Sequence, residues 1–95
     1  MVNITHKSST LRKAFAEAIV VVSSKETINA IMENKVPKGN VFEMSKTAGL
    51  FAAKKTSDVI PDCHPLPIEF TSIKFEIRDL EIYITCEIHT IYKTG

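Results

Sequence analysis

Apolar and polar side chains alternate along the last third of the chain. Two alternating runs, 73–78 and 80–89, flank a turn signal at Arg78-Asp79. A period of two residues is typical of a strand with one buried face. The pattern therefore predicts an antiparallel hairpin whose apolar face carries Ile73, Phe75, Ile77, Leu80, Ile82, Ile84, Cys86 and Ile88.

A helical period precedes the hairpin in two places. Ser23 and Glu26 form a capping-box pattern, and an apolar stripe of Ile28, Ile31 and Met32 follows it. This helix should end near Asn34, ahead of a proline.

The second helix begins in the same way. Asn40 and Glu43 can cap it, and the apolar residues Val41, Met44, Ala48 and Phe51 follow at helical spacing. We place Lys54 and Lys55 near its C-terminal end, where positive charge suits the helix dipole.

Two other segments are less regular. Residues 10–22 combine helical spacing and alanines with a β-branched end, so the residues leave helix and strand open. Residues 58–67 hold three prolines, which predicts a largely extended connector.

Composition narrows the class of protein. The chain has 95 residues, a net charge of +1, 44% hydrophobic residues and two cysteines. These values predict one ordered domain, exclude a strongly basic nucleic-acid binder and give no disulfide framework.

No apolar run reaches the roughly 20 residues that span a membrane, and no signal peptide is evident, so we expect a reduced, cytoplasmic protein with no membrane or nucleic-acid partner. One hairpin and two helices give a thin core, which predicts an obligatory partner or a further segment.

Two clusters could carry chemistry. Lys38-Gly39 precedes a helix start, and Lys46, Lys54 and Lys55 follow it. Backbone amides at a helix N-terminus attract anions, so this cluster could bind phosphate. The alternative is a set of solvated surface lysines.

The second cluster is Asp62-Cys63-His64, in the proline-rich connector. Histidine can act as a general acid or base near neutral pH. Cys86 and His89 fall on opposite faces of a predicted strand, so Cys86 should be buried and His89 exposed. We therefore predict no zinc site.

Four runs closely resemble the molybdenum cofactor biosynthesis protein C family. They contain Lys-Gly-Asn, Ala-Gly, Ala-Ala-Lys-Lys-Thr-Ser and Ile-Pro-Asp-Cys-His-Pro-Leu, in the family's order, and lie at Val36–Phe42, Thr47–Leu50, Ala52–Asp58 and Ile60–Leu66. The similarity extends over almost the whole chain, and the Cys-His-Pro-Leu run is its most specific part.

The resemblance implies a ferredoxin-like α+β fold with an antiparallel sheet packed against two helices, and it makes residues 10–22 a strand. It implies a lyase that converts cyclised dihydro-GTP to cyclic pyranopterin monophosphate and pyrophosphate. It further implies a homo-oligomer, from dimer to hexamer, with sites at subunit interfaces. No metal or organic cofactor is implied.

Residue by residue, Lys38 and His64 match catalytic positions of the family. Arg12, Asp62, Cys63 and His64, with Lys54 and Lys55, are assigned to substrate binding. We expect Lys38 and Arg12 to stabilise phosphate charge and His64 to bind the substrate or move a proton.

Three departures from the family pattern also bear on function. Asp62 stands where the family is apolar, and Asn3 and Asn40 stand where it has aspartates.

Family members continue after Lys-Thr-Gly into a helix with a catalytic aspartate and lysine, whereas this sequence ends at Gly95. We therefore expect a single domain, 1–95, that is incomplete at its C-terminus. Its alternatives are an enzyme completed by another chain, a non-catalytic nucleotide-binding or assembly remnant, and a ligand-free interaction domain.

Overall fold

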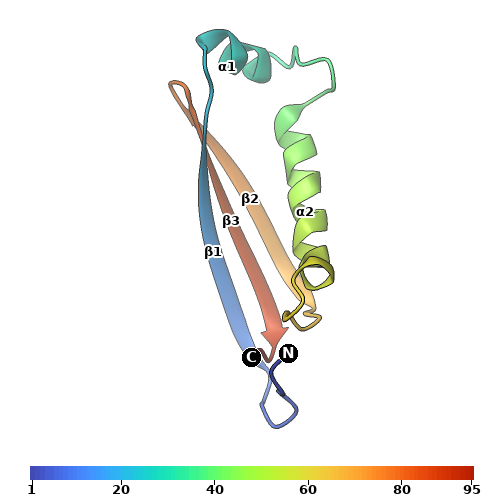
Figure 1. Cartoon of the computed structure of the whole chain (residues 1–95). Coiled ribbons are helices and arrows are strands. Elements are labelled where there is room, and N and C mark those ends of the chain that lie inside the picture. Colours follow the sequence, from blue (N-terminus) through green and yellow to red (C-terminus); the bar gives the residue numbers. More distant parts are fainter.

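A computed structural model describes residues 1–95 as an open three-stranded sheet with two helices (Figure 1). All neighbouring strands are antiparallel, in the order β1-β3-β2. The α+β class expected from the sequence is confirmed. The elements in chain order are β1 (Thr10–Val21), α1 (Lys25–Met32), α2 (Val41–Val59), β2 (Ile68–Arg78) and β3 (Glu81–Tyr92).

The first segment is a strand, as the family resemblance implied. β1 pairs with β3 along its whole length, from Thr10 opposite Tyr92 to Val21 opposite Glu81. Its alanines favour a helix locally, but the pairing with β3 satisfies the backbone on one side of the strand. Pairing with β3 therefore makes this segment a strand rather than a helix.

The predicted hairpin is β2–β3, and the turn at Arg78-Asp79 is confirmed. Asp79 adopts a positive φ of 55° at the first position of a two-residue loop, where glycine is usually preferred. β2 begins at Ile68, five residues before the alternation predicted. Thr71 places a polar side chain on the same face as Ile73, and a bulge between Ile68 and Phe70 interrupts the period of two.

α1 begins one residue later than its sequence pattern indicated. Its N-cap is Ser24, which makes no side-chain cap hydrogen bond, so the capping box at Ser23 and Glu26 was wrong. The shift moves Glu26 out of the third helical position, from which it could reach back to the cap. The predicted end at Asn34 is confirmed: Asn34 has a φ of 56°, and the amide of Lys35 bonds the carbonyl of Ala30, as in a Schellman motif.

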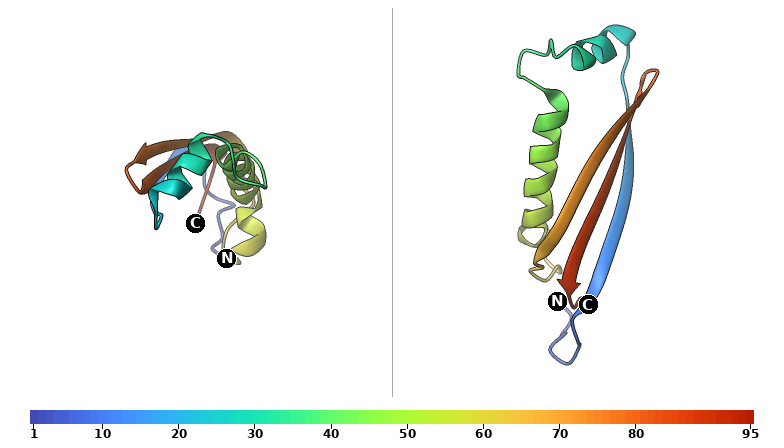
Figure 2. Two further views of the ribbon diagram at one scale, coloured as in Figure 1. Left: turned by 90° about the horizontal axis from the view of Figure 1, so that it is seen from above. Right: turned by 180° about the vertical axis from the view of Figure 1, so that it is seen from behind.

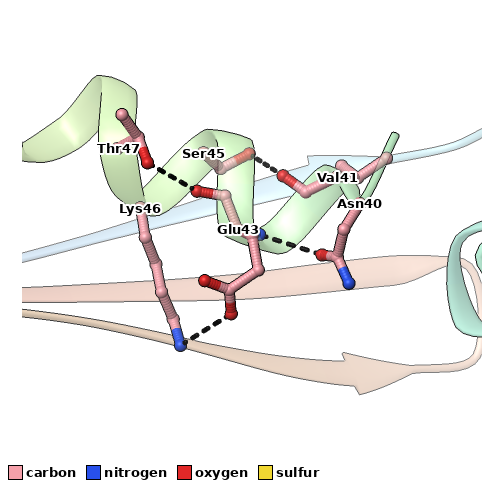
Figure 3. A network of polar contacts seen from close by, with 6 residues as sticks. All are labelled: Asn40, Val41, Glu43, Ser45, Lys46 and Thr47. Atoms are coloured by element: carbon pink, nitrogen blue, oxygen red, sulfur yellow. Dashed lines mark hydrogen bonds and ion pairs between the residues drawn. The ribbon is translucent and has the colours of Figure 1, made fainter. Parts of the chain in front are cut away.

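α2 starts as predicted. Asn40 Oδ1 accepts a hydrogen bond of 2.9 Å from the Glu43 amide (Figure 3). Gly39 precedes the cap with a φ of 109°, which strongly favours glycine. The helix runs to Val59, so its last turn holds no basic residue. The placement of Lys54 and Lys55 at the C-terminal dipole was therefore wrong.

The proline-rich connector is not extended throughout. The amide of Cys63 donates to the carbonyl of Ile60 at 3.0 Å, which closes a turn with Pro61 and Asp62 at its centre. Proline fixes the φ that the second position of such a turn needs. The turn redirects the chain from α2 toward β2.

α2 packs along one face of the sheet, chiefly on β2 (Figures 1 and 2). The rings of Phe42 and Phe75 stack 4.4 Å apart. Gly49 permits a close approach, because a Cβ at this position would lie 2.2 Å from Cδ1 of Ile73. We call this face of the sheet the inner face and the opposite one the outer face.

The molecule is elongated, with extents of 54 × 23 × 20 Å and a radius of gyration of 16.9 Å. A compact domain of this length would have about 12 Å. Only Ile4, Ile28, Ile82 and Thr90 are buried, which confirms the thin core predicted from the sequence. Neither helix has the length and apolar character needed to cross a membrane.

Candidate functional site

A small pocket lies on the inner face, where α2 ends and the proline-rich connector begins. Its volume is about 220 Å³. It brings together three residues that the sequence singled out, namely Lys54, Cys63 and His64. The rest of the lining consists of Ala14, Ala53, Thr56, Ser57, Leu66, Ile68 and Ile88.

His64 is half-buried and held by the start of the chain. Its Nε2 lies 2.9 Å from the carbonyl oxygen of Val2. A carbonyl can only accept, so Nε2 carries the proton of this hydrogen bond. In the neutral ring Nδ1 is then unprotonated, and this nitrogen can accept a proton.

Cys63 and Asp62 differ in orientation although they are neighbours. The half-buried Cys63 lines the pocket, and its thiol donates to the carbonyl of His64 at 3.3 Å. The side chain of Asp62 is 88% exposed and lies 3.1 Å from the amino group of Met1. Asp62 is therefore not brought into the pocket.

The two adjacent lysines of α2 also separate. Lys54 lines the pocket, whereas Lys55 forms an ion pair of 3.4 Å with Asp58. Consecutive helix residues do not share a face. The structure thus places one of the two predicted cations at the pocket.

Arg12 lies beside the pocket but does not line it. It is exposed on β1, opposite Thr90, and shares the inner face with Ala14, which does line the pocket. A cation here adds positive charge at the pocket's edge.

Lys38 is remote from all of these residues. It lies in the turn before α2, at the opposite end of that helix from His64 (Figure 1). A helix of 19 residues is about 28 Å long. One chain therefore does not bring Lys38 and His64 together.

Two features of the pocket were not predicted from the sequence. Ser57 contributes a hydroxyl to the lining, and its place in the Lys-Thr-Ser run could have indicated this. The contact between Val2 and His64 had no signal, since 62 positions separate the two residues.

Cys86 and His89 do not form a site with each other. Cys86 is half-buried and lines an apolar groove of about 430 Å³ between α2 and the sheet. His89 was expected to be exposed, but its side chain is only 22% accessible, because it packs on Phe70 and bonds Glu87. No group of three or more His, Cys, Asp or Glu side chains is arranged to hold a metal ion.

Chemically, the pocket offers a fixed imidazole, a thiol, two hydroxyl side chains and a cation on an otherwise apolar wall. Such a set suits an anionic or polar small molecule that needs a positioned proton acceptor. It holds no carboxylate.

The MoaC family model matches residues 1–95 of this chain. A probable cyclic pyranopterin monophosphate synthase of Pyrococcus furiosus is 43% identical over 95 residues, which are 100% of this chain and 60% of the relative. The cyclic pyranopterin monophosphate synthase of Nitratidesulfovibrio vulgaris is 40% identical over 97 residues, and the match again covers 100% of this chain and 60% of the relative. That of Aquifex aeolicus is 39% identical over 94 residues, which are 99% of this chain and 37% of the relative. The chain thus spans 60% or less of the length of these three relatives.

Proposed function

The chain belongs to the MoaC family, and on that premise we propose that it serves cyclic pyranopterin monophosphate synthesis in molybdenum cofactor biosynthesis. The reaction would be the lyase reaction that converts cyclised dihydro-GTP to cyclic pyranopterin monophosphate and pyrophosphate. The observation that carries the proposal is the pocket at the end of α2. It is built from Lys54, Cys63 and His64, and these come from the two runs that most resemble the family.

His64 is the proposed proton carrier. With Nε2 held by the carbonyl of Val2, Nδ1 is the nitrogen that can take a proton. Lys54 and Arg12 would attract the phosphates of the substrate from the pocket's rim. Cys63 would contact the substrate without forming a bond to it.

The pocket of one chain is too small for the whole substrate. Sites for drug-sized ligands measure about 300–1,000 Å³, and this pocket holds about 220 Å³. Lys38, the other proposed catalytic residue, lies at the far end of α2. We propose that copies of the chain associate, from dimer to hexamer, so that Lys38 of one copy completes the pocket of another.

We further propose that catalysis needs residues beyond this chain. The relatives named above are longer, and the pocket lacks a carboxylate. Residues outside positions 1–95 would supply the remaining acid–base groups, in the reducing environment of the cytoplasm. The second candidate function is a non-catalytic, nucleotide-binding or assembly module, which the small pocket favours.

Turnover of cyclised dihydro-GTP tests the proposal. The purified chain is assayed for pyranopterin and pyrophosphate, alone and with the C-terminal part of the Pyrococcus furiosus relative. We expect product in the mixture, and at least a tenfold loss in His64→Ala, because the pocket then lacks its proton acceptor. His6→Ala, which removes an exposed histidine that does not line the pocket, is the matched control and should retain activity. Substrate binding without turnover in any mixture would support the non-catalytic module instead.

A further inference from the structure

The connector that carries His64 ends against a buried threonine of β3. Thr90 is the one polar residue among the four buried residues of the chain, with a relative accessibility of 7%. Its hydroxyl donates a hydrogen bond to the carbonyl of Pro67, the residue directly before β2, and Ile68 lies opposite Thr90 in the sheet. The end of the connector is therefore joined to β3 by a side-chain bond as well as by strand pairing.

The bulge at the start of β2 directs this junction toward the pocket. Strict alternation from Ile73 would place Ile68 on the outer face of the sheet, whereas the extra residue between Ile68 and Phe70 turns it to the inner face. There Ile68 lines the pocket together with His64. Thr90 thus holds the connector at the point where it passes the pocket.

The run from His64 to Pro67 has little conformational freedom. The rings of Pro65 and Pro67 fix φ at about −65°. His64 and Leu66 each precede a proline, which disfavours the helical region for both. A restraint on the carbonyl of Pro67 therefore also restrains the backbone of His64.

Two other contacts hold the connector, but neither replaces Thr90. The amide of Cys63 bonds the carbonyl of Ile60 at 3.0 Å, which fixes the side toward α2. The bond of 2.9 Å between His64 and the Val2 carbonyl forms only when the ring is already in place. Without the Thr90 hydroxyl, the carbonyl of Pro67 loses its donor, and a polar group left in this way moves toward water to regain a bond.

We propose that Thr90 is a positioning residue for His64. Its hydroxyl fixes Pro67, and the stiff run between them carries this restraint to His64, so that Nε2 meets the Val2 carbonyl and Nδ1 stays free to accept a proton. Thr90 does not line the pocket, so it acts through the connector rather than on the substrate. The effect on catalysis rests on the proposed function, whereas the effect on the imidazole does not.

The ring nitrogens of His64 give the direct test. They are followed in the 95-residue chain by long-range proton–nitrogen correlation spectra, at alkaline pH, where the rings are neutral. In the wild type we expect one tautomer, protonated on Nε2, and two widely separated nitrogen resonances. Thr90→Val keeps the shape of the side chain but removes the donor, so the two resonances should move toward each other as the tautomers mix. Thr90→Ser keeps the hydroxyl and should retain the wild-type pattern.

Thr71→Val is the matched control. It makes the same change at a buried hydroxyl on the neighbouring strand, and this hydroxyl has no hydrogen-bond partner. The His64 resonances should therefore stay as in the wild type. Identical His64 spectra in Thr90→Val and the wild type overturn the proposal, as does an equal change in Thr71→Val.

A measurement on the wild type covers the case in which Thr90→Val does not fold. A buried hydroxyl that donates a hydrogen bond exchanges slowly with water. We expect a resolved Thr90 hydroxyl proton close in space to Pro67. Rapid exchange of this proton would show that the bond is absent and would overturn the proposal.

Turnover separates this inference from the proposed function. In the mixture described above, Thr90→Val should lower kcat about tenfold, because the proton acceptor is misplaced. KM should change less than about twofold, since the residues at the rim are untouched. A wild type that is inactive in every mixture would contradict the proposed function, but the spectra would still decide whether Thr90 positions His64.

Discussion

At the residue scale, the strongest electrostatic coupling lies at the hairpin end of the sheet. The phenol of Tyr83 donates a hydrogen bond of 2.6 Å to Glu81, and the guanidinium of Arg78 lies 4.2 Å from the centre of the Tyr83 ring. The hydrogen bond to the Glu81 carboxylate raises the pKa of Tyr83, because ionisation would remove the donor and place two negative charges side by side. Arg78 also bonds Glu76 and lowers the pKa of that carboxyl.

Titration of Tyr83 tests this coupling. The chain has two tyrosines, so Tyr92→Phe leaves Tyr83 as the only phenol, which can be followed by its ultraviolet absorbance. We expect a pKa above the ordinary value of about 10. Adding Glu81→Gln should lower the pKa, because a neutral amide replaces the carboxylate. Glu87→Gln, which removes a carboxylate of β3 without a bond to Tyr83, should not change it. Equal pKa values with and without Glu81 would contradict the assignment.

The two pKa shifts make opposite contributions to the pH dependence of stability. The pKa of Tyr83 is raised on folding, so its interaction stabilises the fold below the unfolded pKa of about 10 and is lost as the pH rises through the folded pKa. The pKa of Glu76 is lowered, so its contribution is present above the unfolded pKa and is lost as the pH falls through the folded pKa. Both groups lie at the surface, and solvent keeps both contributions small.

At the element scale, the position of α2 depends on a glycine. A Cβ on Gly49 would lie 2.2 Å from Cδ1 of Ile73 on β2, so either the Ile73 side chain or the helix must move. Overpacking typically costs about 1–3 kcal/mol, whereas alanine favours a helix interior by about 1 kcal/mol over glycine. Helix propensity therefore favours alanine at position 49, whereas packing of the helix against β2 favours glycine.

A double-mutant cycle separates these two effects. Gly49→Ala should be better tolerated in the presence of Ile73→Val, which removes Cδ1, than in the wild-type background. We expect a coupling of about 1 kcal/mol in the free energy of unfolding, measured with urea. Gly49→Ala with Ile84→Val, a change on β3 that leaves Ile73 intact, is the control pair. Strict additivity of Gly49→Ala and Ile73→Val would show that the contact does not limit the packing of α2.

At the scale of the whole molecule, one chain keeps its two proposed catalytic residues at opposite ends of α2. A single small substrate would have to span about 28 Å to touch both. Association of copies removes this difficulty, because Lys38 of one copy can then meet His64 of another. The elongated shape and the few buried residues also favour a molecule that gains stability from contacts outside these 95 residues.

Mixing two inactive variants tests the shared site. Lys38→Ala and His64→Ala should each lose activity in the assay with the completing polypeptide. Refolded together, they should regain about a quarter of the wild-type rate, since half of the dimers are mixed and one of their two sites is intact. Two preparations of His64→Ala mixed in the same way are the control. A mixture that stays as inactive as its components would place the site within single chains.

The sequence by itself determined the features that depend on near neighbours. The alternation of β3, the turn at Asp79, the cap at Asn40 and the end of α1 at Asn34 each rest on interactions within a few residues, and the structure confirms them. The motif around Cys63 and His64 likewise identified the family and half of the candidate site.

Only the tertiary structure decided the features that join distant parts of the chain. β1 is a strand because its backbone pairs with that of β3, although its alanines favour a helix. His64 is oriented by Val2, and Lys38 is separated from it by the length of α2. Local patterns report the preferences of short segments, whereas these outcomes depend on pairing and packing between segments far apart in sequence, which carry no local signal.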